Sequence, residues 1–117
     1  MVAIDLNSDL GESWGAYSKG EDEAVLSIIT SANVACGYHA GDPVVMRDTL
    51  KTAKIKEVAV GAHPSYLDLI GFGRRRIVGD SPEVLERQIA YQIGALQGIA
   101  AMTNTKVTHV KSHGSLG

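Results

Sequence analysis

Cysteine, long apolar runs and blocks of one charge are scarce or missing in this sequence, and each shortage excludes a class of protein. The 117 residues include a single cysteine, Cys36, so no internal disulfide can form. No apolar stretch approaches the roughly 20 residues that a membrane-spanning helix needs. The N-terminus carries Asp5 where a signal peptide would carry a basic region. We therefore expect a cytoplasmic protein that is not inserted in a membrane.

The charges are balanced and dispersed, which excludes the simplest electrostatic partners. The chain has 11 basic and 13 acidic residues, a formal net charge of -2, and no extended block of one sign. This pattern gives no reason to expect a nucleic acid or an anionic membrane as a partner. The basic cluster in GFGRRRI, residues 74–76, is too short for a polyanion patch but is compatible with a phosphate clamp.

Four short runs rich in valine, isoleucine and alanine lack the polar alternation of half-exposed strands: residues 2–6, 32–36, 58–62 and 107–110. Strands that are apolar on both faces are typical of parallel sheets covered by helices. Apolar residues between the runs recur with helical spacing, which predicts helices near residues 22–30, 43–56 and 82–102. Asp42 before Pro43 and Ser81 before Pro82 are N-cap signals for the last two helices. The order βαβαβαβ predicts an α/β fold, with one domain over residues 1–117 and a consecutive parallel sheet, open or curled toward a barrel.

Polar residues follow the predicted strands, and in a parallel sheet these positions share one rim, where α/β folds bind ligands. The first run leads into Asn7, Asp9 and Glu12, the second into Tyr38, His39 and Asp42, the third into His63 and Ser65, and the fourth into Lys111 and His113. Gly37 and Gly41 flank His39 and allow a sharp turn and a close approach to a ligand. The sequence therefore predicts a common site at this rim.

Three histidines, two carboxylates and a lysine on one rim supply general acids, general bases and a cation for hydrolysis or acyl transfer. An Asp/His/His set could equally bind a divalent metal. Structural roles stay open for Asp5, for Asp42 as an N-cap, for His109 as a core histidine and for the arginines 74–76. Lys111 is harder to explain structurally, because lysine beside a buried strand is costly unless its charge is used. HExxH, Walker A, GxSxG and CxxC motifs are absent, which disfavours the common zinc-protease, P-loop, α/β-hydrolase and thioredoxin chemistries.

Four segments carry a resemblance to a known family: IDLNSDLGE, SANVACGYHAGDP, VGAHPSYLDLIGFGRR and HVKSHGSL. In this order and spacing they resemble the LamB/YcsF family over essentially the whole chain. The resemblance implies the A-subunit of a bacterial ATP-dependent 5-oxoprolinase, which acts with subunits B and C to open the lactam of 5-oxo-L-proline and yield L-glutamate. It also implies a fold similar to the seven-stranded (β/α) barrel of the glycoside hydrolase/deacetylase type, in which sugar deacetylases hold a metal with one aspartate and two histidines.

The resemblance also implies roles for individual residues. The catalytic residues would be Asp9, His39, His63, Lys111 and His113, and the substrate-binding residues Asn7, Glu12, Asn33, Arg74 and His109. A divalent metal, where one is bound, would be held by Asp9, His39 and His63, and ATP would enter with the partner subunits. Phosphorylation of the lactam oxygen makes a better leaving group, so Lys111 and Arg74 suit the anion, and Asp9 or a histidine suits the base.

The chain departs from the family pattern at two positions and in length. Ser112 stands where the family has proline, and Gly117 stands where it has tyrosine. Family members are about twice as long, so residues 1–117 would form about half of a seven-stranded barrel. A half barrel would expose an apolar inner face and edge strands, so we expect a homo-oligomer. The alternative functions are a metal-dependent deacetylase-like hydrolase and a noncatalytic carbohydrate- or lactam-binding module.

Overall fold

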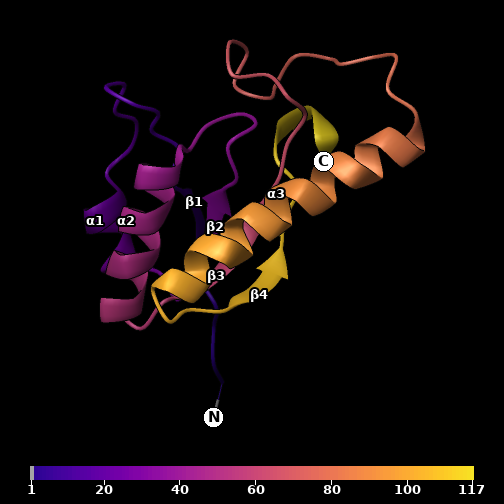
Figure 1. Cartoon of the computed structure of the whole chain (residues 1–117). Helices are drawn as coiled ribbons and strands as arrows, with labels where there is room; N and C mark the ends of the chain where they lie inside the picture. The colour runs from indigo at the N-terminus through magenta and orange to yellow at the C-terminus, as the bar shows by residue number, and fades with distance from the viewer. Residues whose placement is uncertain (1) are drawn as a thin grey trace.

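The computed structural model describes residues 2–117 and has an α/β architecture with a parallel sheet (Figure 1). The strands lie in the order β1-β2-β3-β4, and each neighbouring pair is parallel. The elements are β1 (Asn7–Leu10), α1 (Asp22–Leu26), β2 (Ser31–Ala35), α2 (Pro43–Ile55), β3 (Ala59–His63), α3 (Pro82–Met102), β4 (Val107–Val110) and the 3-10 helix η1 (Gly114–Leu116). The predicted fold class and the consecutive strand order are confirmed.

The core lies between the sheet and the helices α2 and α3, which pack against each other over one face of the strands (Figure 1). Its largest buried side chains include Leu26, Leu50 and Leu96 from the three α-helices. Both predicted N-caps are present. The Asp42 carboxylate accepts backbone N–H bonds at the start of α2, and the Ser81 hydroxyl accepts one at the start of α3. Within residues 2–117, no helix is long and apolar enough to cross a membrane.

The first strand and the first helix differ from the sequence prediction. β1 covers Asn7–Leu10, whereas residues 2–6 are exposed and run away from the sheet (Figure 1). Pairing with β2 starts at the Leu6 carbonyl, which accepts from the Thr30 and Ser31 N–H groups. The helix predicted over residues 22–30 ends at Leu26, because the next N–H groups bond three residues back in tighter turns. The other predicted boundaries agree within one residue.

The sheet face opposite the helices is polar, so the expectation of an apolar inner face is wrong. Alternate positions of β1 and β2 place Asn7, Asp9, Ser31 and Asn33 on this face, and a register shift between β3 and β4 adds His109. These residues line or adjoin an open polar hollow. The sequence does not indicate this polar face, because its remaining positions are alanine and glycine and the runs therefore look apolar throughout. Self-association stays a prediction, but an exposed apolar inner face is no longer a reason to expect it.

Candidate active site

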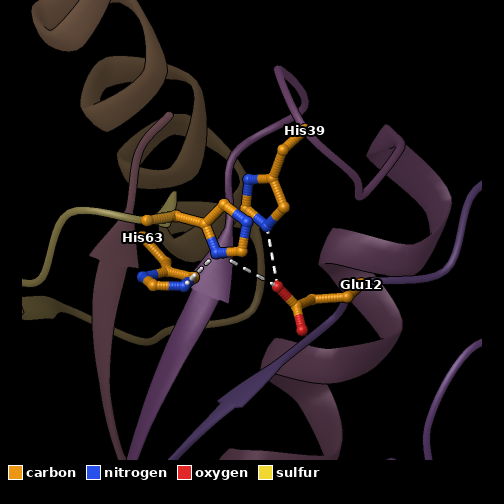
Figure 2. Close-up of side chains that lie close together, drawn as sticks. Glu12, His39 and His63 are labelled. Atoms are coloured by element: carbon orange, nitrogen blue, oxygen red, sulfur yellow. Dashed lines mark hydrogen bonds and ion pairs between the residues drawn. The ribbon is translucent and has the colours of Figure 1, made fainter. Parts of the chain in front are cut away.

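Four side chains, one after or at the end of each strand, meet at the carboxyl rim of the sheet. Glu12 follows β1, His39 follows β2, His63 ends β3 and His113 follows β4. One nitrogen or oxygen atom of each lies within 4.8 Å of the corresponding atoms of the other three. Figure 2 shows Glu12, His39 and His63 converging from separate segments. The common rim site expected from the sequence therefore has a compact centre, the Glu/His cluster, made of these four residues.

Glycines make the dense packing of the cluster possible. Gly41 has a φ of 82°, and a Cβ there would lie 2.8 Å from the Gly11 carbonyl oxygen. Gly73 has a φ of 68°, and a Cβ there would lie 2.9 Å from atoms of both His39 and His113. The rings of His39 and His113 stack with centroids 3.6 Å apart, and both are almost fully buried. A side chain at Gly73 would push the two histidines out of position, and one at Gly41 would collide with the backbone next to Glu12.

The tautomers of His63 and His113 are fixed by backbone carbonyls, which only accept hydrogen bonds. His63 donates Nδ1–H to the Lys111 carbonyl at 2.7 Å, and His113 donates Nε2–H to the Phe72 carbonyl at 2.8 Å. Burial lowers the pKa of His63, and it lowers the pKa of His113 to about 4, so both rings are neutral at pH 7. Their remaining nitrogens, 2.9 Å apart, then direct two lone pairs at each other. This arrangement calls for a positive charge between them.

Glu12 supplies negative charge to the same point. Its Oε2 atom lies 2.7 Å from Nε2 of His39 and 3.7 Å from Nδ1 of His113. Ligand atoms about 2.0–2.2 Å from one zinc-like ion lie about 3 Å from each other, so these separations suit a shared cation. One carboxylate oxygen and three imidazole nitrogens form a donor set for a divalent transition metal. The Glu/His cluster thus has the chemistry and the spacing to hold a metal ion.

Asp9 lies beside the cluster and is held by several partners. Its Oδ1 atom accepts from Lys111 Nζ at 2.9 Å and from Asn33 Nδ2 at 3.2 Å, and its Oδ2 atom lies 3.4 Å from Nε2 of His63. Burial opposes the ionisation of Asp9, but Lys111, His63 and Asn33 outweigh it and hold its pKa below the ordinary value. A half-exposed carboxylate with a fixed lysine beside a histidine has the composition of an acid–base site.

A second layer on the inner face orients Asp9. Because Asp9 can only accept, the amide nitrogen of Asn33 points toward it, and also bonds Asn7 Oδ1 at 3.0 Å. The amide oxygen of Asn33 then faces Nε2 of His109 at 3.0 Å, so this ring nitrogen is the donor. The His109 ring reaches Asn33 across Gly61, where a Cβ would lie 2.2 Å from its Cδ2 atom. Asn33 thus contacts Asp9 directly, and Asn7 and His109 contact the Asn33 amide.

Several other polar residues have structural partners. Asp42 caps α2 and accepts from the Gly15 N–H at 2.6 Å, and Asp5 bonds the hydroxyls of Thr30 and Ser31. Burial raises the pKa of the Cys36 thiol to about 12, which makes it a poor nucleophile. These contacts support the structural interpretation of Asp5, Asp42 and Cys36.

The three consecutive arginines are not equivalent. Arg75 forms an ion pair with the buried carboxylate of Asp68, whose pKa its side-chain hydrogen bonds lower to about 2. Arg74, the expected substrate ligand, lies outside the Glu/His cluster, with its guanidinium carbon 5.8 Å from the centre of the Phe72 ring. Arg74 is therefore at the edge of the site, and Arg75 stabilises the loop.

Comparison with known proteins identifies the family of this chain. Residues 4–117 match the LamB/YcsF family. This chain belongs to the LamB/YcsF family. It is 57% identical over 115 residues to the A-subunit of 5-oxoprolinase from Nitrobacter hamburgensis, covering 98% of this chain and 45% of the relative. It is 53% identical over 116 residues to that of Bacillus cytotoxicus, covering 99% and 46%.

A solved structure gives the same result for the fold of this LamB/YcsF chain. The crystal structure of the lactam utilization protein from Thermus thermophilus superposes with a TM-score of 0.95 at 44% identity, covering 98% of this chain and 46% of that one. The chain thus spans about half the length of the curated relatives it matches. A partial (β/α) barrel is consistent with these overlaps.

Two features of the LamB/YcsF site add to the sequence interpretation. That interpretation places Glu12 among the substrate ligands and Asp9 among the metal ligands, and these roles stay predictions. The structure adds that Glu12 contacts His39, whereas Asp9 contacts His63. The sequence interpretation also leaves out Gln92, although the buried amide of this residue bonds both backbone groups of Ser65, two residues after His63. The available signal is a glutamine within the apolar stripe of the third helix.

Proposed function

We propose that this LamB/YcsF chain carries the reactive rim of an A-subunit of the 5-oxoprolinase type. The reaction would be the hydrolytic opening of the 5-oxo-L-proline lactam to L-glutamate, coupled to ATP hydrolysis. The observation that carries the proposal is the contact of Asp9 with both Lys111 and His63, directly beside the Glu/His cluster. The names of the relatives supply the reaction class, and the rim supplies groups that suit it.

Each group can be given a task in the hydrolysis of an unstrained amide. Asp9, kept ionised by Lys111, would take a proton from the attacking water as the water oxygen bonds to the lactam carbon. Lys111 would stabilise the negative charge that develops on the lactam oxygen, or a phosphate attached to it. The carbon–nitrogen bond then breaks, and the departing nitrogen takes the proton that Asp9 accepted from water; a phosphate on the lactam oxygen would leave as inorganic phosphate as the carboxylate of glutamate forms. Arg74, at the edge of the site, suits the phosphate.

The proposal for cofactors has two parts. ATP would be used together with the partner subunits B and C, in the cytoplasm. A divalent cation would be held by Glu12, His39, His63 and His113, whose facing lone pairs and carboxylate fit one. When bound, it would polarise a carbonyl oxygen or lower the pKa of a water molecule. The fixed N–H bonds from His63 and His113 to backbone carbonyls orient the two rings for this role.

The same donor set favours a second candidate, a metal-dependent deacetylase-like hydrolase that acts without ATP. The two candidates differ in their need for a nucleotide. The test is to combine the purified chain with subunits B and C and 5-oxo-L-proline, with and without ATP, and to measure L-glutamate. Formation that requires ATP supports the oxoprolinase. Equal formation without ATP, or release of acetate from N-acetylated sugars instead, would favour the deacetylase-like hydrolase.

A further inference from the structure

An apolar cavity opens directly beside the Glu/His cluster. It has a volume of about 240 Å³. Glu12 and His39 form its polar end, and its walls are Trp14, Tyr17, Ala40, Leu69 and Phe72. The volume is below the roughly 300–1,000 Å³ of pockets for drug-sized ligands, so it suits a very small molecule.

The wall that follows β1 is an ordered turn. Trp14 and Tyr17 exchange two backbone hydrogen bonds of 2.9 and 2.8 Å. The turn is tied to the start of α2, because the Gly15 N–H donates to Asp42 at 2.6 Å and the Gly41 N–H donates to the Ser13 carbonyl at 2.9 Å. Trp14 is therefore held at the cavity by the same carboxylate that caps α2.

The opposite wall comes from the loop after β3. Phe72 has a φ of 56°, an uncommon conformation for a residue with a side chain. Asp68 accounts for it, since its carboxylate accepts from the Gly71 N–H at 2.9 Å and its carbonyl accepts from the Gly73 N–H at 2.9 Å. The Phe72 and His39 rings pack edge to face, with centroids 5.0 Å apart. Both walls are thus fixed relative to the cluster.

Two cationic side chains lie close to the Phe72 ring. Lys19 Nζ lies 4.3 Å from the ring centre, and the Arg74 guanidinium carbon lies 5.8 Å from it. Within residues 2–117, neither cation has a carboxylate oxygen inside 4.0 Å. The cavity thus has a carboxylate and an imidazole at one end and an apolar body. Lys19 and Arg74 are outside its lining but contact its wall Phe72, and neither has an acidic partner among the described residues.

We propose that this cavity binds the ring of a compact anionic lactam, with Trp14, Leu69 and Phe72 against its methylene carbons. The lactam edge projects past Glu12 and His39 toward Asp9 and Lys111, which lie outside the cavity lining, and the carboxylate faces Lys19. The identity of the lactam rests on the proposed function, whereas the preference for a small ring with one negative charge rests on the cavity itself. The assignment makes Trp14, Lys19 and Leu69 specificity-determining residues.

Trp14 is the sole tryptophan of the chain, so its fluorescence reports on this cavity directly. The chain is titrated with 5-oxo-L-proline and, separately, with 2-pyrrolidinone, which has the same ring without the carboxylate. Calorimetry on the same samples measures binding independently of the fluorophore. We expect saturable binding of 5-oxo-L-proline, with 2-pyrrolidinone at least about tenfold weaker because it lacks the charge-assisted contact.

Lys19→Met should weaken the binding of 5-oxo-L-proline about tenfold and leave 2-pyrrolidinone unchanged. Lys51→Met is the matched control, because Lys51 is exposed on α2 and, unlike Lys19, makes no cation–π contact with the cavity wall Phe72. Leu69→Ala should weaken both ligands. Equal affinities for the two ligands, equal behaviour of the two lysine variants, or no binding by either method would overturn the proposal.

The coupled glutamate assay separates this proposal from the proposed function. An unchanged KM in both Lys19→Met and Leu69→Ala, with active parent chain, would exclude the cavity and leave the oxoprolinase function standing. Specific binding of 5-oxo-L-proline with no glutamate formed would support the cavity and contradict the function.

Discussion

Gln92 on α3 supports the loop that leaves His63, and replacing it with leucine measures that support. The Gln92 side chain is fully buried. Its Oε1 atom accepts from the Ser65 N–H at 2.9 Å, and its Nε2 atom donates to the Ser65 carbonyl at 2.9 Å. Leucine has a similar volume, so the main loss is that of two buried backbone partners. At about 1–3 kcal/mol for each unsatisfied group, we expect unfolding to become easier by about 3 kcal/mol.

For a domain of this size, about 3 kcal/mol corresponds to a fall in Tm of roughly 10–20 °C. Thermal and urea denaturation followed by circular dichroism give both quantities. Gln97→Leu is the control, since Gln97 is exposed on the same helix. A Gln92→Leu variant within about 1 kcal/mol of this control would refute the role given to Gln92.

Three further predictions concern the rim. Gly61→Ala places a Cβ where the His109 ring lies and should displace that ring. We expect lower activity in the coupled assay and a loss of about 1–3 kcal/mol in the free energy of unfolding. An unchanged turnover would exclude the orienting role of His109. Asp9→Asn breaks a half-exposed ion pair with Lys111, so it should lower the free energy of unfolding by less than about 1 kcal/mol but reduce glutamate formation about 100-fold or more. Because burial lowers the pKa of His113 to about 4, the unfolded chain binds a proton near pH 6.5 that the folded chain does not, so stability should fall from pH 6.5 toward pH 4. A urea midpoint that stays constant between pH 7.5 and pH 5 would contradict the buried neutral state of this histidine.

Strand order and helix starts could be predicted because their signals are local. The caps at Asp42 and Ser81 depend on a side chain and the next few N–H groups. Parallel pairing is indicated by runs without polar alternation, of which β2 and β3 are buried on both faces. The prediction for β1 is wrong for the opposite reason. Asn7 and Asp9 occupy its inner-face positions, so the strand does not look apolar, whereas the apolar run before it is exposed.

The set of residues at the rim could be predicted, but not the pairing within it. Chain position places Asp9 and Glu12 near the end of the same strand, and sequence does not specify which carboxylate reaches His39. The turn at Gly11, with a φ of 67°, redirects the chain so that Glu12 meets His39 while Asp9 stays on the inner face with Lys111. A side-chain contact of this kind depends on tertiary packing.

Release of L-glutamate from 5-oxo-L-proline is the most direct measurement of the proposed activity. The parent chain and Asp9→Asn would be assayed side by side with subunits B and C, each first shown by circular dichroism to be folded. We expect glutamate from the parent chain only when ATP is present, and almost none from Asp9→Asn. No glutamate from the folded parent chain, or equal rates from the two proteins, would contradict the assignment of this rim as the reactive site.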